Sequence, residues 1–295
     1  MIRYPITPAQ LRARIRAHDA NWLDQATERT NGFEVAGRFT EKSGESIWGA
    51  IKEVYMALQN NKCAYCERKL AGRDVGKIEF DVEHYRPKNG VKAWPTQKLA
   101  RERGLAYDFA TGDAHPEGYF LLAYEPRNYA VACKPCNSAL KSNYFPIGAA
   151  RAKASRSLAK YKSEKPLLPY PIGSGDLDPE SLLLFDGILP TPAAATGFPN
   201  QRARVTIEFF RLADREDLMR ERAEVISHVW YATIALHAAT SAKAKLEAQE
   251  TLEILQSPKN RHSSCAKAFV RLLDEDQSRA KLLYEQIHAF LQSES

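Results

Sequence analysis

Two pairs of cysteines, each pair separated by two residues, restrict the fold of this chain more than any other feature of its sequence. Cys63 and Cys66 form the first pair, and Cys133 and Cys136 form the second. Four thiolates in this spacing are the ligands of a structural tetrahedral zinc site, whereas a redox dithiol needs only one pair. The spacing therefore predicts one structural Zn²⁺ that joins two distant segments. Cys265 stands alone, and we expect it to be a small buried hydrophobic residue.

The composition is that of an ordinary globular protein, with 295 residues of which 44% are hydrophobic and 26% are charged. The first residues show no signal peptide, and no apolar run is long enough to span a bilayer. We therefore expect a soluble, cytoplasmic protein that does not associate with a membrane. In that reducing compartment, paired cysteines are expected to be metal ligands and not disulfides.

The positive charge is concentrated around the cysteine pairs. The net charge is +6, and residues 62–165 hold 20 Lys and Arg against 11 Asp and Glu, while the remainder of the chain holds 22 against 25. A positive field of this kind suits a polyanion whose phosphates need to be neutralised. A solvated basic surface without a ligand explains the same surplus, and charge alone does not separate these two interpretations.

Hydrophobic periodicity and helix-breaking residues predict an α+β fold in four parts. These are an N-terminal helical segment (1–61), a zinc-containing core (62–165), an irregular connector rich in Pro and Gly (166–199) and a C-terminal all-helical domain (200–295). The predicted elements before the connector are a helix over 8–29 with Thr7 as its cap, a loop over 30–42 and a helix over 43–59. They continue with strands over 78–82 and 129–132, a surface excursion over 89–116 between them, and a helix from Cys133. Four or five helices are expected after residue 200, with breaks near 213–214, 239–241 and 257–258.

The first predicted strand brings an acid and a histidine to its end. The imidazole of His84 titrates near neutrality, so it is the candidate general base that takes a proton from water during phosphodiester hydrolysis. The Glu83 carboxylate and the Asn137 amide are hard oxygen ligands, suited to Mg²⁺ or Mn²⁺ as a catalytic metal. The helix after the second cysteine pair would present Asn137 and Lys141 on one face. Asn128 and Asn137 are by default turn and cap residues, and only their spacing from the cysteines makes them candidates.

The stretch from Asp81 to Pro87 fits the pattern acid-x-acid-His-x-x-Pro at every position. Together with the cysteine pairs, it resembles the HNH (ββα-metal) endonucleases, in the four-cysteine zinc variety that has Asn in place of the last His. The resemblance implies a zinc-stapled ββα-metal core in which His84 is the general base and Glu83 a ligand of the catalytic metal. It also implies that Asn128 holds the loop between the strands and helps to orient the base, and that Asn137 is the second metal ligand.

A narrower resemblance covers residues 62–146. There the order Glu-His-x-Arg-Pro-Lys, Leu-Ala-Tyr-Glu, Asn, C-x-x-C-Asn and Phe-Pro is similar to the HNH subunits of Septu-type anti-phage systems, some of them linked to retrons. It implies a nuclease subunit that works with an ABC/SMC-like ATPase in antiviral defence, on DNA in preference to RNA. The alternatives are a stand-alone restriction-like HNH nuclease and a zinc-containing nucleic-acid-binding module without catalysis.

Six basic residues are the candidate contacts to nucleic acid, namely Arg86, Lys88, Lys141, Lys153, Arg156 and Lys160. The last three belong to a basic run over 151–165, which either contacts phosphates or is a solvated face. The four tryptophans are expected in the core or at an interface. Apolar stripes in the C-terminal helices predict a core, with a docking face for a partner as the alternative. These stripes contain Ile207, Phe210, Leu218, Val225, Val229 and Ile234.

Overall fold

The structure is a computed structural model that describes residues 1–70 and 79–293. It consists of two compact units. The sheet unit comprises Arg3–Asn61 and Leu70–Leu177, and the helical unit comprises Met1–Ile2, Lys62–Lys69 and Asp178–Ser295. Each unit contains helices and one small antiparallel sheet, in agreement with the predicted α+β class. Ile78, where the first strand was predicted to begin, lies outside the described residues.

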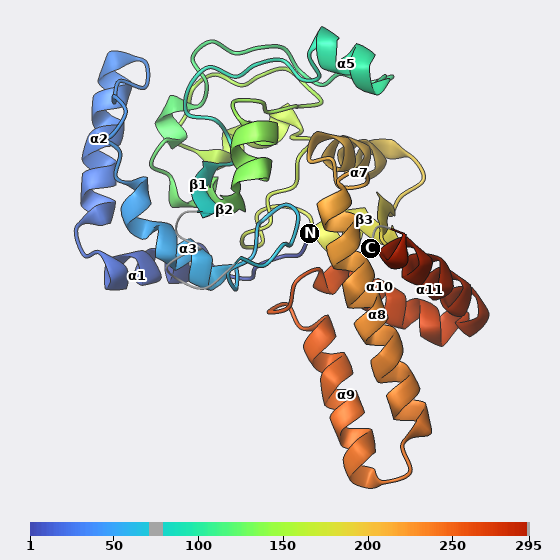
Figure 1. Ribbon diagram of the computed structural model, residues 1–295. Helices are drawn as coiled ribbons and strands as arrows, with labels where there is room; N and C mark the ends of the chain where they lie inside the picture. The colour runs from blue at the N-terminus through green and yellow to red at the C-terminus, as the bar shows by residue number, and fades with distance from the viewer. Residues whose placement is uncertain (71–78, 294–295) are drawn as a thin grey trace. The chain divides into compact units, whose positions relative to one another are not determined.

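Short helices and 3₁₀ segments make up most of the regular secondary structure described in the sheet unit (Figure 1). Its α-helices are α1 (Pro8–His18), α2 (Trp22–Ala36), α3 (Lys52–Leu58) and α5 (Gln97–Arg103). Its 3₁₀ segments are η1 (Trp48–Ile51), η2 (Phe120–Leu122), η3 (Pro126–Asn128) and η5 (Leu158–Glu164), and its π-helix is η4 (Pro135–Lys141). Its strands are β1 (Phe80–His84) and β2 (Tyr129–Cys133).

The first predicted helix is two helices. As predicted, Thr7 caps α1, because its side chain accepts a hydrogen bond from the Gln10 N–H while the Gln10 side chain accepts from the Thr7 N–H. Asp19 then separates α1 from α2, because its carboxylate accepts hydrogen bonds from the backbone N–H groups at the start of the next helix. α2 continues to Gly37, which closes it with a φ of +64°, so residues 30–36 are helical and not loop.

The small sheet of this unit pairs β1 with β2 in antiparallel register, with Glu83 opposite Ala130 and His84 opposite Tyr129. All five residues of β2 are buried. The side-chain amide of Gln59, at the end of α3, both donates to and accepts from the backbone of Val131. This contact satisfies two polar groups of β2, as a buried strand requires. β1 runs two residues past its predicted end at Val82, so Glu83 and His84 are its last two residues.

The segment over 89–116, predicted as a surface excursion, carries the helix α5, which has no buried residue, but it also packs Val91 and Trp94 into the core. It returns to the core at Gly118, which has a φ of +63°. A side chain at this position would collide with the backbone of Asn89 and Pro87, since an ideal Cβ would lie 1.8 Å from the Asn89 carbonyl oxygen. Only glycine therefore lets the chain pass this close to the loop that follows β1.

A β-hairpin lies within the segment that the sequence predicted as an irregular connector. Its strands are β3 (Leu183–Asp186) and β4 (Leu189–Pro192), preceded by the short helix α6 (Pro179–Leu182). Asp186 pairs with Leu189, so the turn has only two central residues, and Gly187 supplies the positive φ, +57°, that such a turn needs. The two prolines within β4, Pro190 and Pro192, concealed the strand, because proline is rare inside a sheet.

Five helices complete the helical unit, with breaks close to the predicted positions. They are α7 (Gly197–Phe209), α8 (Glu216–Ala238), α9 (Ala242–Gln256), α10 (Ser263–Glu275) and α11 (Gln277–Gln292). α8 and α9 form a long antiparallel pair (Figure 1). Most of the predicted apolar stripe is core, since Val225 and Val229 are fully buried, whereas Ile234 is 47% exposed. The break at Asp276 was not predicted; its carboxylate caps α11 by accepting from the Arg279 N–H.

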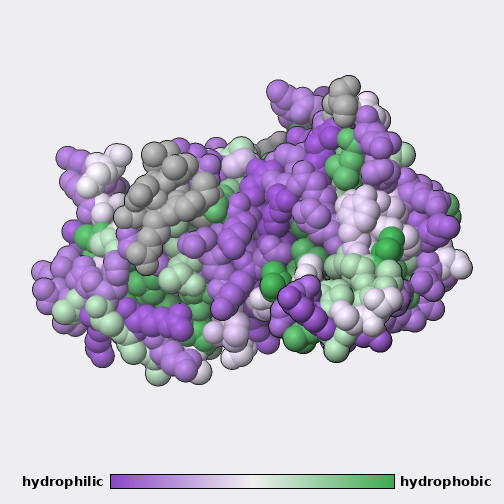
Figure 2. Space-filling view, turned by 60° about the horizontal axis from the view of Figure 1, so that its bottom comes forward, coloured by the Kyte–Doolittle hydropathy of each residue, from purple (hydrophilic) through white to green (hydrophobic). Residues whose placement is uncertain are grey.

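One face of the molecule is largely polar. Figure 2 shows this face, on which hydrophilic residues predominate and hydrophobic residues gather in small groups. Within the described residues, no helix combines the length and the apolar character needed to cross a membrane.

Candidate metal centre and active site

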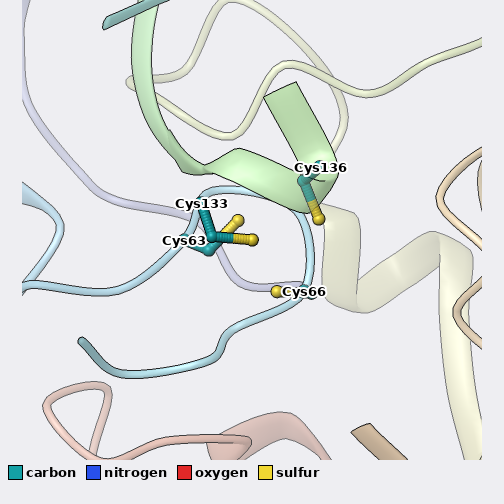
Figure 3. A group of neighbouring side chains, drawn as sticks. All are labelled: Cys63, Cys66, Cys133 and Cys136. Atoms are coloured by element: carbon teal, nitrogen blue, oxygen red, sulfur yellow. The ribbon is translucent and has the colours of Figure 1, made fainter. Parts of the chain in front are cut away.

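The four cysteines of the two C-x-x-C pairs lie together, as predicted. Cys63, Cys66, Cys133 and Cys136 are all buried, and their sulfur atoms lie within 4.8 Å of one another. Figure 3 shows the four side chains converging from two separate stretches of chain. Four thiolates at about 2.3 Å from one zinc ion stand about 3.8 Å apart in a tetrahedron, so this cluster fits Zn²⁺. In the part of the chain that the structure describes, it is the only group of three or more His, Cys, Asp and Glu side chains that fits a metal.

The first cysteine pair is held in a tight turn. The Cys63 N–H donates to the Arg68 carbonyl at 2.9 Å, and the Cys63 carbonyl accepts from the Glu67 N–H at 3.2 Å. Glu67 adopts a φ of +61°, in the left-handed region that reverses the chain. Its buried carboxylate also accepts from the ammonium of Lys62 at 3.4 Å, so both charges next to the knuckle are paired.

The second cysteine pair spans the junction between β2 and η4. Cys133 is the last residue of the strand and Cys136 the second residue of the π-helix. π-Helical turns are rare and occur frequently at functional sites. The predicted helix after Cys133 is therefore present, with a wider turn than an α-helix, and it carries Asn137 and Lys141.

The His84 side chain is buried, with 8% of its surface exposed. Its Nε2 atom lies 3.0 Å from the Ala123 carbonyl oxygen. Its ring stands edge-on to two aromatic rings, Trp48 at 4.8 Å and Tyr129 at 5.0 Å between ring centres. Burial lowers the pKa of His84 well below the ordinary value, and the nearby Lys88 ammonium lowers it further. The imidazole is therefore neutral near pH 7, as a general base must be.

Asn128 holds the turn behind His84. Its side-chain oxygen accepts from the Arg86 N–H at 2.8 Å, and its side-chain nitrogen donates to the Arg86 carbonyl at 3.0 Å and to the Leu122 carbonyl at 3.1 Å. Its backbone carbonyl accepts from the Tyr85 N–H at 2.8 Å. The amide is fully buried and thus joins the chain after β1 to the chain before β2. These hydrogen-bond partners are all backbone groups, so Asn128 is a positioning residue in this geometry.

Glu83 lies on the opposite face of β1 from His84, because successive strand residues alternate. Its Oε1 atom is 3.0 Å from Nζ of Lys141, and both side chains are buried. Burial raises the pKa of Glu83, and the Lys141 ammonium opposes that rise. The Oε1 atom is buried, yet no group in the described residues gives it an aligned hydrogen bond. A buried carboxylate oxygen without an aligned hydrogen bond fits a hard cation such as Mg²⁺ or Mn²⁺, although the Lys141 ammonium already lies beside it.

Asn137, the predicted second ligand, is half-buried in η4. Its backbone carbonyl accepts from the Ser142 N–H at 2.6 Å, which closes the π-helix. η4 thus places Asn137 and Lys141 within the same short helix, and Lys141 reaches Glu83. If a divalent cation binds, Glu83 and Asn137 are the residues that would hold it.

The predicted contacts to nucleic acid divide into buried and exposed groups. Arg86 is buried, ion-paired with Glu164 and bonded to the Tyr161 carbonyl, and Lys141 is buried with Glu83. Neither charge is available to a phosphate in this conformation. Lys153 and Lys160 are exposed, and Lys88 is half-buried.

Arg156 is also exposed and makes an ion pair within the sheet unit. Its guanidinium lies 2.6 Å from Glu34 and 2.8 Å from Asn31, both on α2. An exposed pair of this kind contributes little stability and exchanges readily for another anion. Arg156 thus remains a candidate for phosphate contact, although its partner in this structure is the Glu34 carboxylate.

Two residues near His84 were not foreseen as part of the site. The ring of Trp48 touches His84 and also faces Lys88, whose Nζ lies 4.5 Å from the Trp48 ring centre. The same ammonium lies 5.4 Å from the Phe39 ring centre. These aromatic contacts hold the Lys88 charge beside Trp48, and that charge lowers the pKa of the candidate base. No spacing rule connects these residues in sequence, so only their packing reveals them.

Comparisons of the chain with protein-family models, with curated proteins and with solved structures found no match. The HNH resemblance therefore remains a prediction that rests on the sequence motif.

Proposed function

We propose that this chain is a metal-dependent endonuclease of the HNH type, which hydrolyses phosphodiester bonds in nucleic acid. The observation that supports the proposal most is the contact between His84 Nε2 and the Ala123 carbonyl. A carbonyl only accepts, so a neutral ring carries its hydrogen on Nε2, and Nδ1 keeps the lone pair that a general base needs. Glu83 precedes His84 on β1, and Asn128 is the last residue of η3, so the three follow one another in the order of the motif.

In the proposed reaction, the Nδ1 atom of His84 accepts a proton from the water whose oxygen attacks phosphorus. The bond from phosphorus to the leaving oxygen breaks, and that oxygen finally takes a proton from solvent. A bound Mg²⁺ or Mn²⁺ would stabilise the negative charge on the leaving oxygen. Lys88, held against Trp48, adds a positive charge near the base that favours approach of a phosphate.

We further propose that the nuclease is the subunit of an anti-phage complex that contains an ABC/SMC-like ATPase, as the narrower resemblance implies. The composition of the helical unit is consistent with a role other than catalysis. Its main part, Asp178–Ser295, contains none of the proposed catalytic residues, although it holds the six helices α6 to α11. It therefore serves either to support the fold or to bind another subunit.

The test is a cleavage assay with the purified, zinc-loaded chain. Supercoiled plasmid DNA and folded RNA are incubated with Mg²⁺ or Mn²⁺, with and without the product of the adjacent gene. We expect cleavage that requires the divalent cation, that increases with the partner, and that is lost in the His84→Ala variant. Efficient cleavage by the isolated chain would favour the restriction-like alternative. Binding without any cleavage would favour a zinc-containing binding module and overturn the nuclease proposal.

A further inference from the structure

Lys141 is a lysine with no exposed surface, and its ammonium has two oxygen partners on β1. Nζ lies 3.0 Å from Glu83 Oε1 and 3.3 Å from the backbone carbonyl of His84. A buried ammonium is unfavourable unless it is paired and hydrogen-bonded, so these two contacts determine where the side chain can lie. Lys141 thereby connects the end of η4 to the two strand residues that carry the proposed chemistry.

The same carboxylate oxygen is the one that a divalent cation would bind. Mg²⁺ binds carboxylate oxygens at about 2.1 Å, whereas the Lys141 nitrogen stands 3.0 Å from Oε1. A divalent cation and an ammonium that share one oxygen would lie within a few ångströms of each other. Like charges at that separation repel strongly in a buried site, where the effective dielectric constant is low.

We propose that the Lys141 ammonium is the resident counter-cation of Glu83, and that it competes with the divalent cation for this carboxylate. The inference rests on the proposed function, because it takes Glu83 as a metal ligand. It assigns Lys141 a role different from direct phosphate contact. In the free chain, Lys141 neutralises Glu83 and keeps the affinity for Mg²⁺ or Mn²⁺ low.

A purely structural role for Lys141 makes a different prediction. If the lysine only ties η4 to β1, its removal lowers stability and leaves the metal affinity unchanged or weaker. If it competes, its removal raises the affinity, because Glu83 loses its resident cation while keeping its oxygens. The sign of the change in affinity therefore separates the two roles.

The experiment measures Mn²⁺ binding to the full-length, zinc-loaded chain without nucleic acid, from the electron paramagnetic resonance signal of free Mn²⁺. Lys141→Met removes the charge and keeps an unbranched side chain, and Lys141→Arg keeps the charge. We expect Lys141→Met to bind Mn²⁺ about tenfold or more tightly than the unchanged chain, and Lys141→Arg to stay close to it. Adding Glu83→Gln to Lys141→Met should abolish the gain. Equal affinities in Lys141→Met and the unchanged chain, with zinc content and melting intact, would overturn the proposal.

A second measurement needs no substitution at Lys141, so it can be made even if the Lys141→Met variant does not fold. The unchanged chain is acetylated with acetic anhydride at increasing Mn²⁺ concentrations, and peptides are quantified by mass spectrometry. Competition predicts that modification of Lys141 rises with Mn²⁺, because the displaced amine becomes accessible. Lys134, which is exposed on the same segment, is the internal control and should not change. A constant, low modification of Lys141 while Mn²⁺ binds at Glu83 would overturn the proposal.

Failure of this inference is distinct from failure of the nuclease proposal. A chain that cleaves nucleic acid but shows no effect of Lys141→Met refutes only the competition. A chain that gains Mn²⁺ affinity in Lys141→Met but never cleaves refutes the nuclease and leaves the competition in place.

Discussion

The carbonyl oxygen of Ala123 lies 3.0 Å from the Nε2 atom of His84. The Tyr129 hydroxyl donates to the same carbonyl, so the acceptor is held from a second side. Because the acceptor fixes which ring nitrogen carries hydrogen, it also fixes which nitrogen is basic. The neutral, oriented imidazole is the feature of this site that is most directly open to test.

Replacing His84 with alanine should reduce cleavage by about 10²–10⁴-fold, the usual loss when a general base is removed. Nucleic-acid binding should be retained, because the imidazole is almost fully buried. Initial rates on plasmid DNA, with any required partner present, give the measurement. The matched control is His228→Ala, the same change at an exposed position of α8, which should cleave normally. A normal rate in His84→Ala would remove His84 from the mechanism.

Asn128→Ala should destabilise the fold by about 3 kcal/mol, because it leaves buried backbone groups of Arg86 and Leu122 without partners. Urea unfolding at a fixed Zn²⁺ concentration measures the loss. Asn137→Ala is the contrasting variant, since its side chain is half-buried. It should keep its stability to within about 0.5 kcal/mol and lose activity that higher Mg²⁺ or Mn²⁺ partly restores. Equal stability of Asn128→Ala and the unchanged chain would contradict the positioning role.

One zinc ion per chain is expected, bound by the four clustered cysteines. Cys133→Ser should lose the zinc and lower the melting temperature by a large amount, because metal binding and folding are coupled. Cys265→Ser is the control: Cys265 is also buried, and its thiol donates to the Gly187 carbonyl, a hydrogen bond that a hydroxyl can also make. Elemental analysis and thermal melting measure both effects. Full stability of Cys133→Ser without zinc would show that the cluster is not a structural metal site.

Charge reversal in the basic run should weaken nucleic-acid binding and its dependence on salt. Lys153 and Lys160 are exposed, so the double change to Glu removes two candidate phosphate contacts. Each lost contact should make the slope of log affinity against log salt shallower by about 0.9 on duplex DNA. The control reverses Lys243 and Lys245, which are exposed on α9. Identical slopes in the two variants would mean that the basic run is only a solvated face.

Stability should fall as pH decreases from about 7 to about 5.5, in part through His262. Burial lowers the pKa of His262, and the hydrogen bond to Glu221 opposes this shift. In the unfolded chain the histidine has a pKa of about 6.5, so as the pH falls it binds a proton that the folded histidine does not bind. The contribution of His262 to stability is therefore fully present above that pH and is lost progressively below it.

His262→Asn tests this pH dependence, because asparagine tolerates the φ of +49° at that position. Melting temperatures across the range should change less with pH in the variant than in the unchanged chain. Some slope should remain, since the pKa of His84 is shifted in the same direction. A variant with the full slope would exclude His262 as a source of the pH dependence.

Local patterns in the sequence were sufficient for several features of the fold. Thr7 was predicted as a helix cap, because capping depends on a few adjacent residues. The strand that ends on His84 and the breaks between the last helices also follow from local signals. The cysteine cluster was predicted as well, because ligand spacing within each pair reflects the tetrahedral geometry of the metal and not the rest of the fold.

Other features depend on contacts between residues that are distant in the chain. The split at Asp19 was not predicted, because the hydrophobic periodicity over 8–29 favoured one long helix. The hairpin of β3 and β4 was not predicted, because the prolines and glycines of that segment favoured an irregular connector. Trp48 reaches His84, and Lys141 reaches Glu83, only through packing. By itself, the sequence determined which chemical groups are present and how neighbouring residues are spaced. The tertiary structure alone decided which group neutralises which, because burial and charge pairing depend on every element packed around a side chain.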